Sequence, residues 1–282
     1  MKSGYQIVIL VGAGRSGTKI FRDVLASHKE IDCTPHDLNY VWKIGNYDKS
    51  HDALKVEDLS PSIKKAIQTQ IDRYSTGAPW LIEKTVSNTI RLPFVMSVFP
   101  NARIIHLVRN GKDVVDSVYR QWGETRGLSY FISKIKTYPL KHGLSYLASY
   151  VRDWIRFKFL RKGGEAYIWG VKYPGYEEDA KHYSILERIA LQWKICINNA
   201  SDYIDSIEKE RVHFLRYEDL VANPSVELSK VVHFLNLTSD EFPGYSNLHS
   251  ENVGKGNAIF EGDEANNAKR IIEPVLSKLN YV

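Results

Sequence analysis

The sequence predicts an α/β protein with a mainly parallel central sheet flanked by helices. Apolar segments of strand length alternate along the chain with amphipathic segments of helix length, which is the pattern of consecutive βαβ units. The first apolar segment, residues 7–11, contains no polar residue and is followed by glycine, as expected for a parallel strand buried on both faces. No internal repeat and no linker rich in Pro, Gly or Ser divides the chain, so one domain over residues 1–282 is expected.

The turn after this first strand is rich in glycine and leads directly into a helix. The turn reads Gly12-Ala13-Gly14-Arg15-Ser16-Gly17-Thr18, and the helix is expected to bury Ile20, Phe21, Val24 and Leu25. Glycines let the backbone approach an anion closely, and the N–H groups and positive dipole end of the helix point toward that anion. Since Arg15 adds a cation and Ser16 and Thr18 add hydroxyls, the segment predicts a phosphate-binding loop.

Two kinds of phosphate loop are compatible with these residues. Gly12, Gly14 and Gly17 satisfy the G-x-G-x-x-G pattern of dinucleotide-binding enzymes, in which Asp32 or Asp37 could bind a ribose. The alternative is a loop that contains an arginine and continues directly into Ser-Gly-Thr. A Walker loop is excluded, because its Gly-Lys-Ser/Thr sequence is missing here.

The remaining elements follow from apolar periodicity and from the residues that end each segment. Because Pro35 limits helix formation, His36 and Asp37 are expected in a loop above the sheet. Residues 43–51 are expected to be irregular. Further strands are expected at 31–33, 80–85, 103–109 and 212–216, and further helices at 60–74, 89–99, 112–120, 178–207, 225–235 and 265–279.

Residues 121–178 interrupt the alternation of strands and helices. Aromatic and basic side chains are frequent in this segment and are mixed with glycines. We interpret it as a helical cap over the sheet, at which an acceptor molecule could bind. The alternative interpretation is plain packing of aromatic residues. The basic residues would suit a sugar or an anionic glycan, and a hydrophobic small molecule fits nearly as well.

Composition and charge are those of an ordinary globular protein, with 282 residues, 43% hydrophobic and 25% charged. The net charge of +5 suits anionic ligands, but it is too small to indicate a nucleic-acid partner. Cys33 and Cys196 lie far apart without metal-ligand spacing, so we expect no zinc site, no disulfide and a cytoplasmic location. The early first strand and the lack of an 18-residue apolar run predict neither a leader nor a membrane span.

A second anion-binding pattern follows the strand expected at 103–109. Arg109 would offer a guanidinium fork, and Ser117, on the next helix, would offer a hydroxyl to the same phosphate. Gly14-Arg15-Ser16-Gly17-Thr18 resembles the 5′-phosphosulfate loop of sulfotransferases, and Arg109 with Ser117 resembles their 3′-phosphate motif. The resemblance is to sulfotransferases that use 3′-phosphoadenosine 5′-phosphosulfate (PAPS), and it implies a three-layer fold like that of P-loop nucleotide kinases.

Three further stretches are similar to the same family. Lys84-Thr85 with Asn88 resembles its Lys-Thr-Pro-x-x-Asn segment, with Val86 in place of the proline. The residues from Arg216 to Leu220 match its Arg-Tyr-Glu-Asp-Leu block, in which Tyr217 would border the adenine. Gly254-Lys255-Gly256-Asn257 resembles its late loop, whose lysine closes on the 3′-phosphate.

The resemblance implies transfer of a sulfuryl group from PAPS to a hydroxyl or amine of a carbohydrate or small-molecule acceptor, with 3′-phosphoadenosine 5′-phosphate (PAP) as product. The implied nucleotide-binding residues are Gly14, Arg15, Ser16, Gly17, Thr18, Lys19, Arg109, Ser117, Tyr217, Lys255, Gly256 and Asn257. The acceptor's identity and the oligomeric state stay open at this stage.

Such a transfer is an in-line attack, so catalysis is chiefly positioning and neutralisation of charge. Arg15 is expected to stabilise the leaving phosphate and the sulfonate, and no metal is required in principle because arginine and the helix dipole supply positive charge. His36 is the expected base, with Asp37 as an alternative base or as its orienting partner. Lys84 would contact the sulfonate or be an ordinary cation at a strand end, and His106 is expected to be a core histidine.

Two other functions remain as alternatives. An enzyme that binds a nucleotide or dinucleotide through its three loop glycines would bind ATP or NAD independently of Arg109 and would give Ser117 no role. A non-catalytic nucleotide-binding relative would keep the fold and lack a base.

Overall fold

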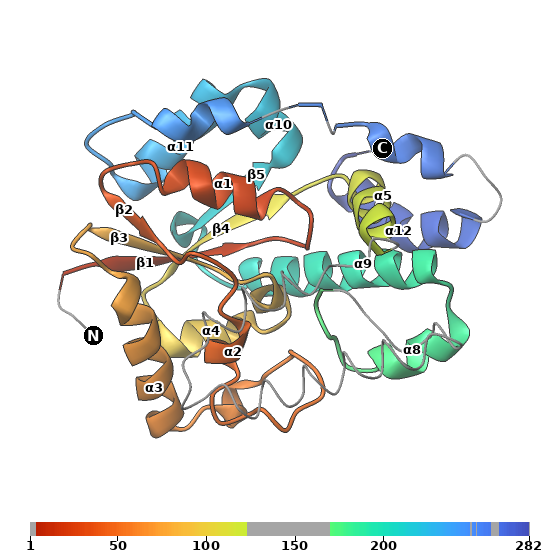
Figure 1. Ribbon diagram of the computed structural model, residues 1–282, viewed down its shortest axis with the longest axis horizontal. Helices are drawn as coiled ribbons and strands as arrows, with labels where there is room; N and C mark the ends of the chain where they lie inside the picture. The colour runs from red at the N-terminus through yellow and green to blue at the C-terminus, as the bar shows by residue number, and fades with distance from the viewer. Residues whose placement is uncertain (1–3, 123–169, 249, 252, 261–264, 282) are drawn as a thin grey trace.

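The computed structural model describes residues 4–122, 170–248, 250–251, 253–260 and 265–281. At its centre lies a five-stranded parallel sheet with the strand order β2-β3-β1-β4-β5 (Figure 1). The strands are β1 (Gln6–Val11), β2 (Ile31–Cys33), β3 (Trp80–Lys84), β4 (Arg103–Val108) and β5 (Val212–Arg216). The predicted α/β class and parallel sheet are therefore confirmed, and each expected strand agrees with the structure to within one residue at either end.

The strand order separates this fold from the dinucleotide-binding one. Here β1 lies between β3 and β4, with Ile9 opposite Glu83 on one side and opposite Ile104 on the other. In dinucleotide-binding and flavodoxin-like sheets, β1 lies beside β2. The G-x-G-x-x-G pattern therefore stands in a sheet whose topology disagrees with the dinucleotide interpretation.

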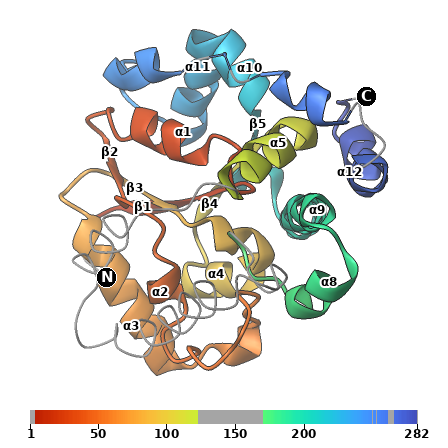
Figure 2. The same ribbon diagram turned by 45° about the vertical axis from the view of Figure 1, so that its right-hand side comes forward.

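Helices cover both faces of the sheet and make three layers, which the two ribbon views show together (Figures 1 and 2). One face is covered by α1 (Thr18–Leu25), α10 (Tyr217–Ala222) and α11 (Pro224–Leu235). The other face is covered by α2 (Asn39–Trp42), α3 (Pro61–Ile71) and α4 (Leu92–Val98). The long helix α9 (Ile185–Ile204) packs with α5 (Gly111–Trp122), α8 (Tyr176–His182) and α12 (Asn266–Lys278). Short 3₁₀ turns are η1 (Val56–Asp58), η2 (Asp72–Tyr74), η3 (Val86–Ile90), η4 (Lys209–Arg211), η5 (Pro243–Asn247) and η6 (Lys255–Phe260).

Alternate side chains of β1 enter two different cores. Val8 and Leu10 pack with Phe21 of α1, whereas Ile7 and Ile9 pack in the core that contains Phe94 of α4. Because both faces are covered, the strand has no solvent side, which explains why its sequence is continuously apolar.

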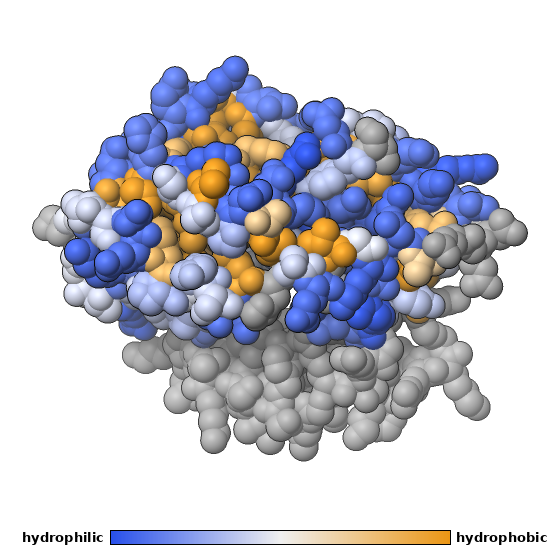
Figure 3. Space-filling view, turned by 90° about the horizontal axis from the view of Figure 1, so that it is seen from above, coloured by the Kyte–Doolittle hydropathy of each residue, from blue (hydrophilic) through white to orange (hydrophobic). Residues whose placement is uncertain are grey.

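The outer surface of the α1–α11 layer mixes hydrophobic and hydrophilic residues. Figure 3, the view from above Figure 1, shows orange patches interspersed with blue and white rather than one continuous apolar area. Ile20, Val226 and Tyr245 are among the exposed apolar side chains. Scattered residues of this kind are normal on a protein surface.

The expected burial of Ile20 is wrong, since this side chain is 36% exposed. The buried stripe of α1 runs through Thr18, Phe21 and Leu25, and Ile20 lies at its margin. Arg22 of the same helix is buried, and its charged group has partners there. The guanidinium donates to the carbonyl of Pro35 at 2.7 Å and pairs with the neighbouring Asp23.

The single helix expected at 178–207 is also wrong, because the structure has two helices there. Tyr183 is extended, and Ser184 starts α9 with a capping box in which its hydroxyl and the Glu187 carboxylate each accept a backbone N–H. The helix expected at 89–99 begins only at Leu92, after the 3₁₀ turn η3.

Residues 123–169, which make up most of the predicted cap, lie outside the described residues. Cys33 and Cys196 are both free thiols. No helix in the described part of the chain is long and apolar enough to cross a membrane.

His106 on β4 is buried, as expected of a core histidine. Burial lowers the pKa of its imidazole from 6.5 to about 4. The unfolded chain therefore binds a proton at this residue between these pH values, whereas the folded chain does not.

We predict that His106→Leu makes stability less dependent on pH below 6.5. The native protein should lose up to about 1.4 kcal/mol per pH unit through this residue as the pH falls from 6.5 toward 4, and this loss should vanish in the variant. Urea denaturation at a series of pH values measures the slope. His233→Leu, at an exposed position of α11, is the matched control and should keep the native slope. Equal slopes for His106→Leu and the native protein would contradict the prediction.

Candidate functional site

The glycine turn connects β1 to α1 at the carboxyl edge of the sheet. Gly17 caps the helix in the left-handed conformation (φ 88°), and a Cβ there would lie 2.3 Å from the ring of Tyr217. Only glycine tolerates both that backbone and that close approach. The turn is therefore packed directly onto the start of α10, the element that follows β5.

Arg15 joins this turn to the second anion-binding pattern. Its Nε donates to Ser117 Oγ at 3.0 Å, and its carbonyl accepts from Arg109 Nη1 at 3.1 Å. Arg15 itself is exposed and has a positive φ of 68°, which is uncommon for a residue with a side chain. The structure thus brings Arg15, Arg109 and Ser117 together, as the sequence predicts.

Ser16 is fully buried inside the same turn, and its hydroxyl has no hydrogen-bond partner among the described residues. No side chain caps the N-terminus of α1, and its first turn contains no acidic residue. A buried polar atom without a partner costs free energy unless a ligand or water satisfies it. These features fit an anion held by the Ser16 hydroxyl and the first N–H groups of α1, with Thr18 buried and Lys19 exposed in that helical turn.

The Arg-Tyr-Glu block positions the end of β4. The guanidinium carbon of Arg109 lies 4.8 Å from the centre of the Tyr217 ring, and the Arg109 side chain is buried. Glu218 Oε1 accepts the backbone N–H of Asn110 at 2.9 Å, and Glu218 Oε2 accepts the Tyr281 hydroxyl at 2.7 Å. Tyr217 and Glu218 therefore contact Arg109 and Asn110, the two consecutive residues that follow β4.

The late loop docks on the first turn of α5 through Asp113. Its two carboxylate oxygens accept the backbone N–H groups of Gly254 and Gly256 at 2.9 and 2.8 Å, and Arg109 Nη2 lies 3.6 Å from Asp113 Oδ2. A Cβ on Gly256 would come within 2.2 Å of the Lys112 backbone, so glycine is needed there. The neighbouring Lys255 and Asn257 are exposed at this docked loop.

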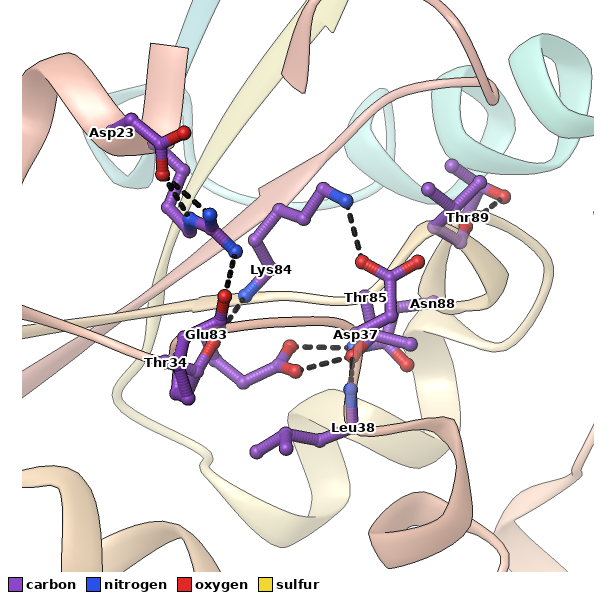
Figure 4. A network of polar contacts seen from close by, with 12 residues as sticks. Asp23, Thr34, Asp37, Leu38, Glu83, Lys84, Thr85, Asn88 and Thr89 are labelled. Carbon is purple, nitrogen blue, oxygen red and sulfur yellow. Dashed lines mark hydrogen bonds and ion pairs between the residues drawn. The ribbon is translucent and has the colours of Figure 1, made fainter. Parts of the chain in front are cut away.

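The loop with His36 and Asp37 lies next to the end of β3 (Figure 4). Lys84 Nζ forms an ion pair with Asp37; the Lys84 side chain is 8% exposed and that of Asp37 is 41% exposed. His36, the residue before Asp37, is half-buried. The three predicted catalytic side chains besides Arg15 thus share one loop and one strand end.

Asp32, a ribose-binding candidate in the dinucleotide interpretation, has a structural role instead. Its carboxylate accepts from the backbone and hydroxyl of Thr76 at 2.6 and 2.7 Å and from the N–H of Ala78 at 3.3 Å. It closes the turn before β3, and the other candidate, Asp37, is paired with Lys84.

Three acidic residues of the site were given no role in the sequence-based prediction. Asp113 is signalled only by its position four residues after Arg109, and Glu218 by its place in the Arg-Tyr-Glu block. Glu83 is a lone acid at the end of an apolar strand, and it accepts hydrogen bonds from Thr85 and Asn88. In the described part of the chain, no three His, Cys, Asp or Glu side chains gather in a way that could hold a metal ion.

Comparisons with known proteins point to one family. A family model described as "Sulfotransferase family" matches residues 7–179. An uncharacterized protein of Aquifex aeolicus is 29% identical over 127 residues, which is 40% of this chain and 17% of that protein. Mouse protein-tyrosine sulfotransferase 1 is 26% identical over 123 residues, which is 40% of this chain and 33% of that protein. The matches therefore span one third or less of these two relatives.

A solved structure shares the fold over nearly the whole chain. The sulfotransferase domain from the curacin biosynthetic pathway has a TM-score of 0.53 at 16% identity, and the match covers 96% of this chain and 97% of that one. At this level of identity the likeness concerns the fold alone.

We predict that Asp113→Asn loosens the late loop. An amide offers one acceptor oxygen where the carboxylate offers two, so the N–H of Gly254 or Gly256 should lose its partner. Hydrogen exchange over residues 253–260 should accelerate roughly tenfold, the equivalent of about 1.4 kcal/mol. Asp116→Asn on the same helix, where the carboxylate pairs with exposed Arg120, is the matched control. Equal exchange rates in both variants would contradict the role of Asp113.

Proposed function

Since the chain belongs to the sulfotransferase family, whose model matches residues 7–179, we propose that it transfers a sulfuryl group from PAPS to an acceptor hydroxyl or amine. The acceptor would be a carbohydrate or a small molecule. One observation carries the proposal, namely that hydrogen bonds join the two turns. Arg15 donates to the Ser117 hydroxyl, and Arg109 donates to the Arg15 carbonyl. A nucleotide with anions at both ends of its ribose could therefore contact both turns at once.

The residues present fit such a nucleotide. The Ser16 hydroxyl is buried and has no partner among the described residues, and it suits the 5′-phosphate together with the N-terminus of α1, Gly14, Gly17 and Thr18. Arg109, Ser117 and the docked late loop with Lys255, Gly256 and Asn257 suit the 3′-phosphate. Tyr217 is buried between Gly17 and Arg109, so we assign it to holding these two residues at the border of the adenine site. PAPS, when bound, would supply the activated sulfuryl group.

Arg15 is proposed to neutralise the negative charge that builds up as the bond to sulfur breaks. Its guanidinium is exposed at the turn and is held in place by Ser117, so it need not reorganise during the reaction. Preorganised charge of this kind acts more strongly in the transition state than a mobile surface cation would.

His36 is proposed to take the proton of the acceptor hydroxyl. Asp37 is held by Lys84, so we assign it to orienting this loop and Lys84 to contacting the sulfonate. The name of the mouse relative adds a tyrosine hydroxyl to the acceptors worth testing. A single domain and a cytoplasmic site of action, which suits the two free thiols, remain parts of the proposal.

PAP should bind more tightly than 5′-AMP, and Arg109→Ala should remove most of that preference, because the guanidinium would contact the 3′-phosphate. A charge-assisted hydrogen bond contributes about 1.5–3 kcal/mol, so PAP binding should weaken roughly 10–100-fold while AMP binding changes little. Isothermal titration calorimetry measures both constants.

Arg120→Ala is the matched control, since this exposed arginine of α5 pairs with Asp116 away from the turn. NAD or ATP binding that is indifferent to Arg109 would support the dinucleotide alternative. Absence of PAP binding by the native protein would overturn the proposal.

Turnover can be measured with radiolabelled PAPS and three acceptors: a desulfated glycan, a simple phenol and a tyrosine peptide. Arg15→Ala should lower kcat by about 10²–10³-fold, with a smaller effect on PAP affinity. His36→Ala should lower it by about 10²-fold. His233→Ala on the exposed face of α11 should leave it unchanged. PAP binding without transfer to any of these acceptors would favour a non-catalytic relative.

A further inference from the structure

Glu83 is a fully buried carboxylate on β3, and both of its oxygens accept hydrogen bonds (Figure 4). The hydroxyl of Thr85 donates to Oε1 at 2.5 Å, and the amide of Asn88 donates to Oε2 at 2.8 Å. Removing a carboxylate from water is costly, and these donors offset part of that cost. A polar residue at such a position therefore calls for a function beyond packing.

Thr85 links Glu83 to the loop that carries His36 and Asp37. Thr85 Oγ1 accepts the backbone N–H of Leu38 at 2.8 Å. A hydroxyl has one proton, and giving it to Glu83 leaves the oxygen lone pairs for Leu38. The ionised Glu83 carboxylate therefore orients the Thr85 hydroxyl, with its proton toward Glu83 and its lone pairs toward the N–H of Leu38.

The second donor, Asn88, is held in one orientation. Arg91 Nε donates to Asn88 Oδ1 at 2.8 Å, so the amide nitrogen of Asn88 has to face Glu83. Each Glu83 oxygen thus faces a donor, an arrangement that suits a carboxylate, whose two oxygens only accept. The network favours the ionised form of Glu83.

The loop is attached to β3 on both sides of His36. Before His36, the N–H of Thr34 donates to the Ile82 carbonyl at 2.9 Å, and the N–H of Lys84 donates to Thr34 Oγ1 at 3.3 Å. After His36, Leu38 is the attachment point, through Thr85. The Thr85 contact is thus the one whose strength depends on Glu83.

We propose that Glu83 is a positioning residue that holds His36 and Asp37 in place beside Lys84 through the Thr85 hydroxyl. Its consequence for turnover rests on the proposed sulfuryl transfer, whereas the link between Glu83 and Leu38 belongs to the fold itself. Glu83 acts through Thr85 and does not touch the reacting groups.

The link should respond to pH. Burial raises the pKa of Glu83 to about 7. The Thr85 hydroxyl and the Trp42 indole of α2 oppose the rise, Asp37 from the loop adds to it, and Arg91 reduces it. A protonated Glu83 accepts hydrogen bonds more weakly than the carboxylate does, and its own proton competes with the donors of Thr85 and Asn88. The Thr85 hydroxyl is then oriented less firmly, and the hold on Leu38 weakens as the pH falls below about 7.

The experiment follows the Leu38 amide by NMR in the ¹⁵N-labelled protein. The native amide shift should titrate with a midpoint near pH 7, and Glu83→Gln should abolish that titration. At pH 8 the Leu38 amide of this variant should exchange roughly tenfold faster than in the native protein. Glu57→Gln, at an exposed position of η1, is the matched control and should behave as native. A Leu38 titration that persists in Glu83→Gln overturns the proposal.

If Glu83→Gln fails to fold, Thr85→Val tests the same link between Glu83 and Leu38. Valine keeps the shape of threonine and leaves Glu83 in place, but it offers Leu38 no acceptor. The Leu38 amide should lose both its titration and its slow exchange. An unchanged Leu38 amide in Thr85→Val overturns the proposal.

Turnover separates the positioning role from the reaction itself. Glu83→Gln should lower kcat about tenfold at pH 8, while PAP affinity stays within about twofold of native, because the phosphate turns lie on other strands. Native kcat in a variant whose Leu38 amide has lost its titration overturns the positioning role. If the native protein transfers no sulfuryl group but Leu38 responds as expected, the proposed function fails and the link through Thr85 is confirmed.

Discussion

The parallel pairing of β1 with β4 is the constraint on which the candidate site depends. The glycine turn leaves the end of β1 and Arg109 leaves the end of β4, and the register places Val11 opposite His106. Because parallel strands end at the same edge, two turns that are 94 residues apart in the chain meet there, and Arg109 reaches the Arg15 carbonyl. A register shift of one residue would turn the side chains of β4 to the opposite face and separate these groups. The pairing register of these strands thus also determines the spacing of the charges.

A second set of buried polar groups holds the other side of the site. Asp52 accepts from the side chains of Asn39 and Ser87 and from the N–H of Lys172, and Arg91 donates to Asn39. These hydrogen bonds connect α2, η3 and the chain that enters α8. They fix the positions of these three segments relative to one another. Buried charges of this kind contribute little net stability, but a fully satisfied network favours a single geometry. The loop with His36 and Asp37 leads directly into α2, so this network also holds the end of that loop.

The sequence predicted the strands, most helices and the meeting of the glycine turn with Arg109 and Ser117, because these depend on local periodicity and on strand ends. It failed where a tertiary neighbour decides the outcome. Ile20 fits the apolar stripe of α1, yet no part of the core covers it fully. Asp113 binds Gly256, 143 residues later, and no local spacing signals such a pair. The break before α9 did carry a signal, the Ser184 and Glu187 capping box, but apolar periodicity alone ran through it.

Two residues of the glycine turn, Arg15 and Ser16, carry local free-energy costs. The Arg15 backbone has φ 68°, a conformation that costs a residue with a side chain on the order of 1 kcal/mol and that glycine would adopt freely. Glycine at this position would relieve that strain but would remove the guanidinium that Ser117 holds. Beside it, the Ser16 hydroxyl is buried and lacks a partner among the described residues, which is a second local cost. Both costs fall on the turn that an anion would occupy, and both would be offset when an anion binds. Another sequence could therefore make this turn more stable, and anion binding would compensate for the difference.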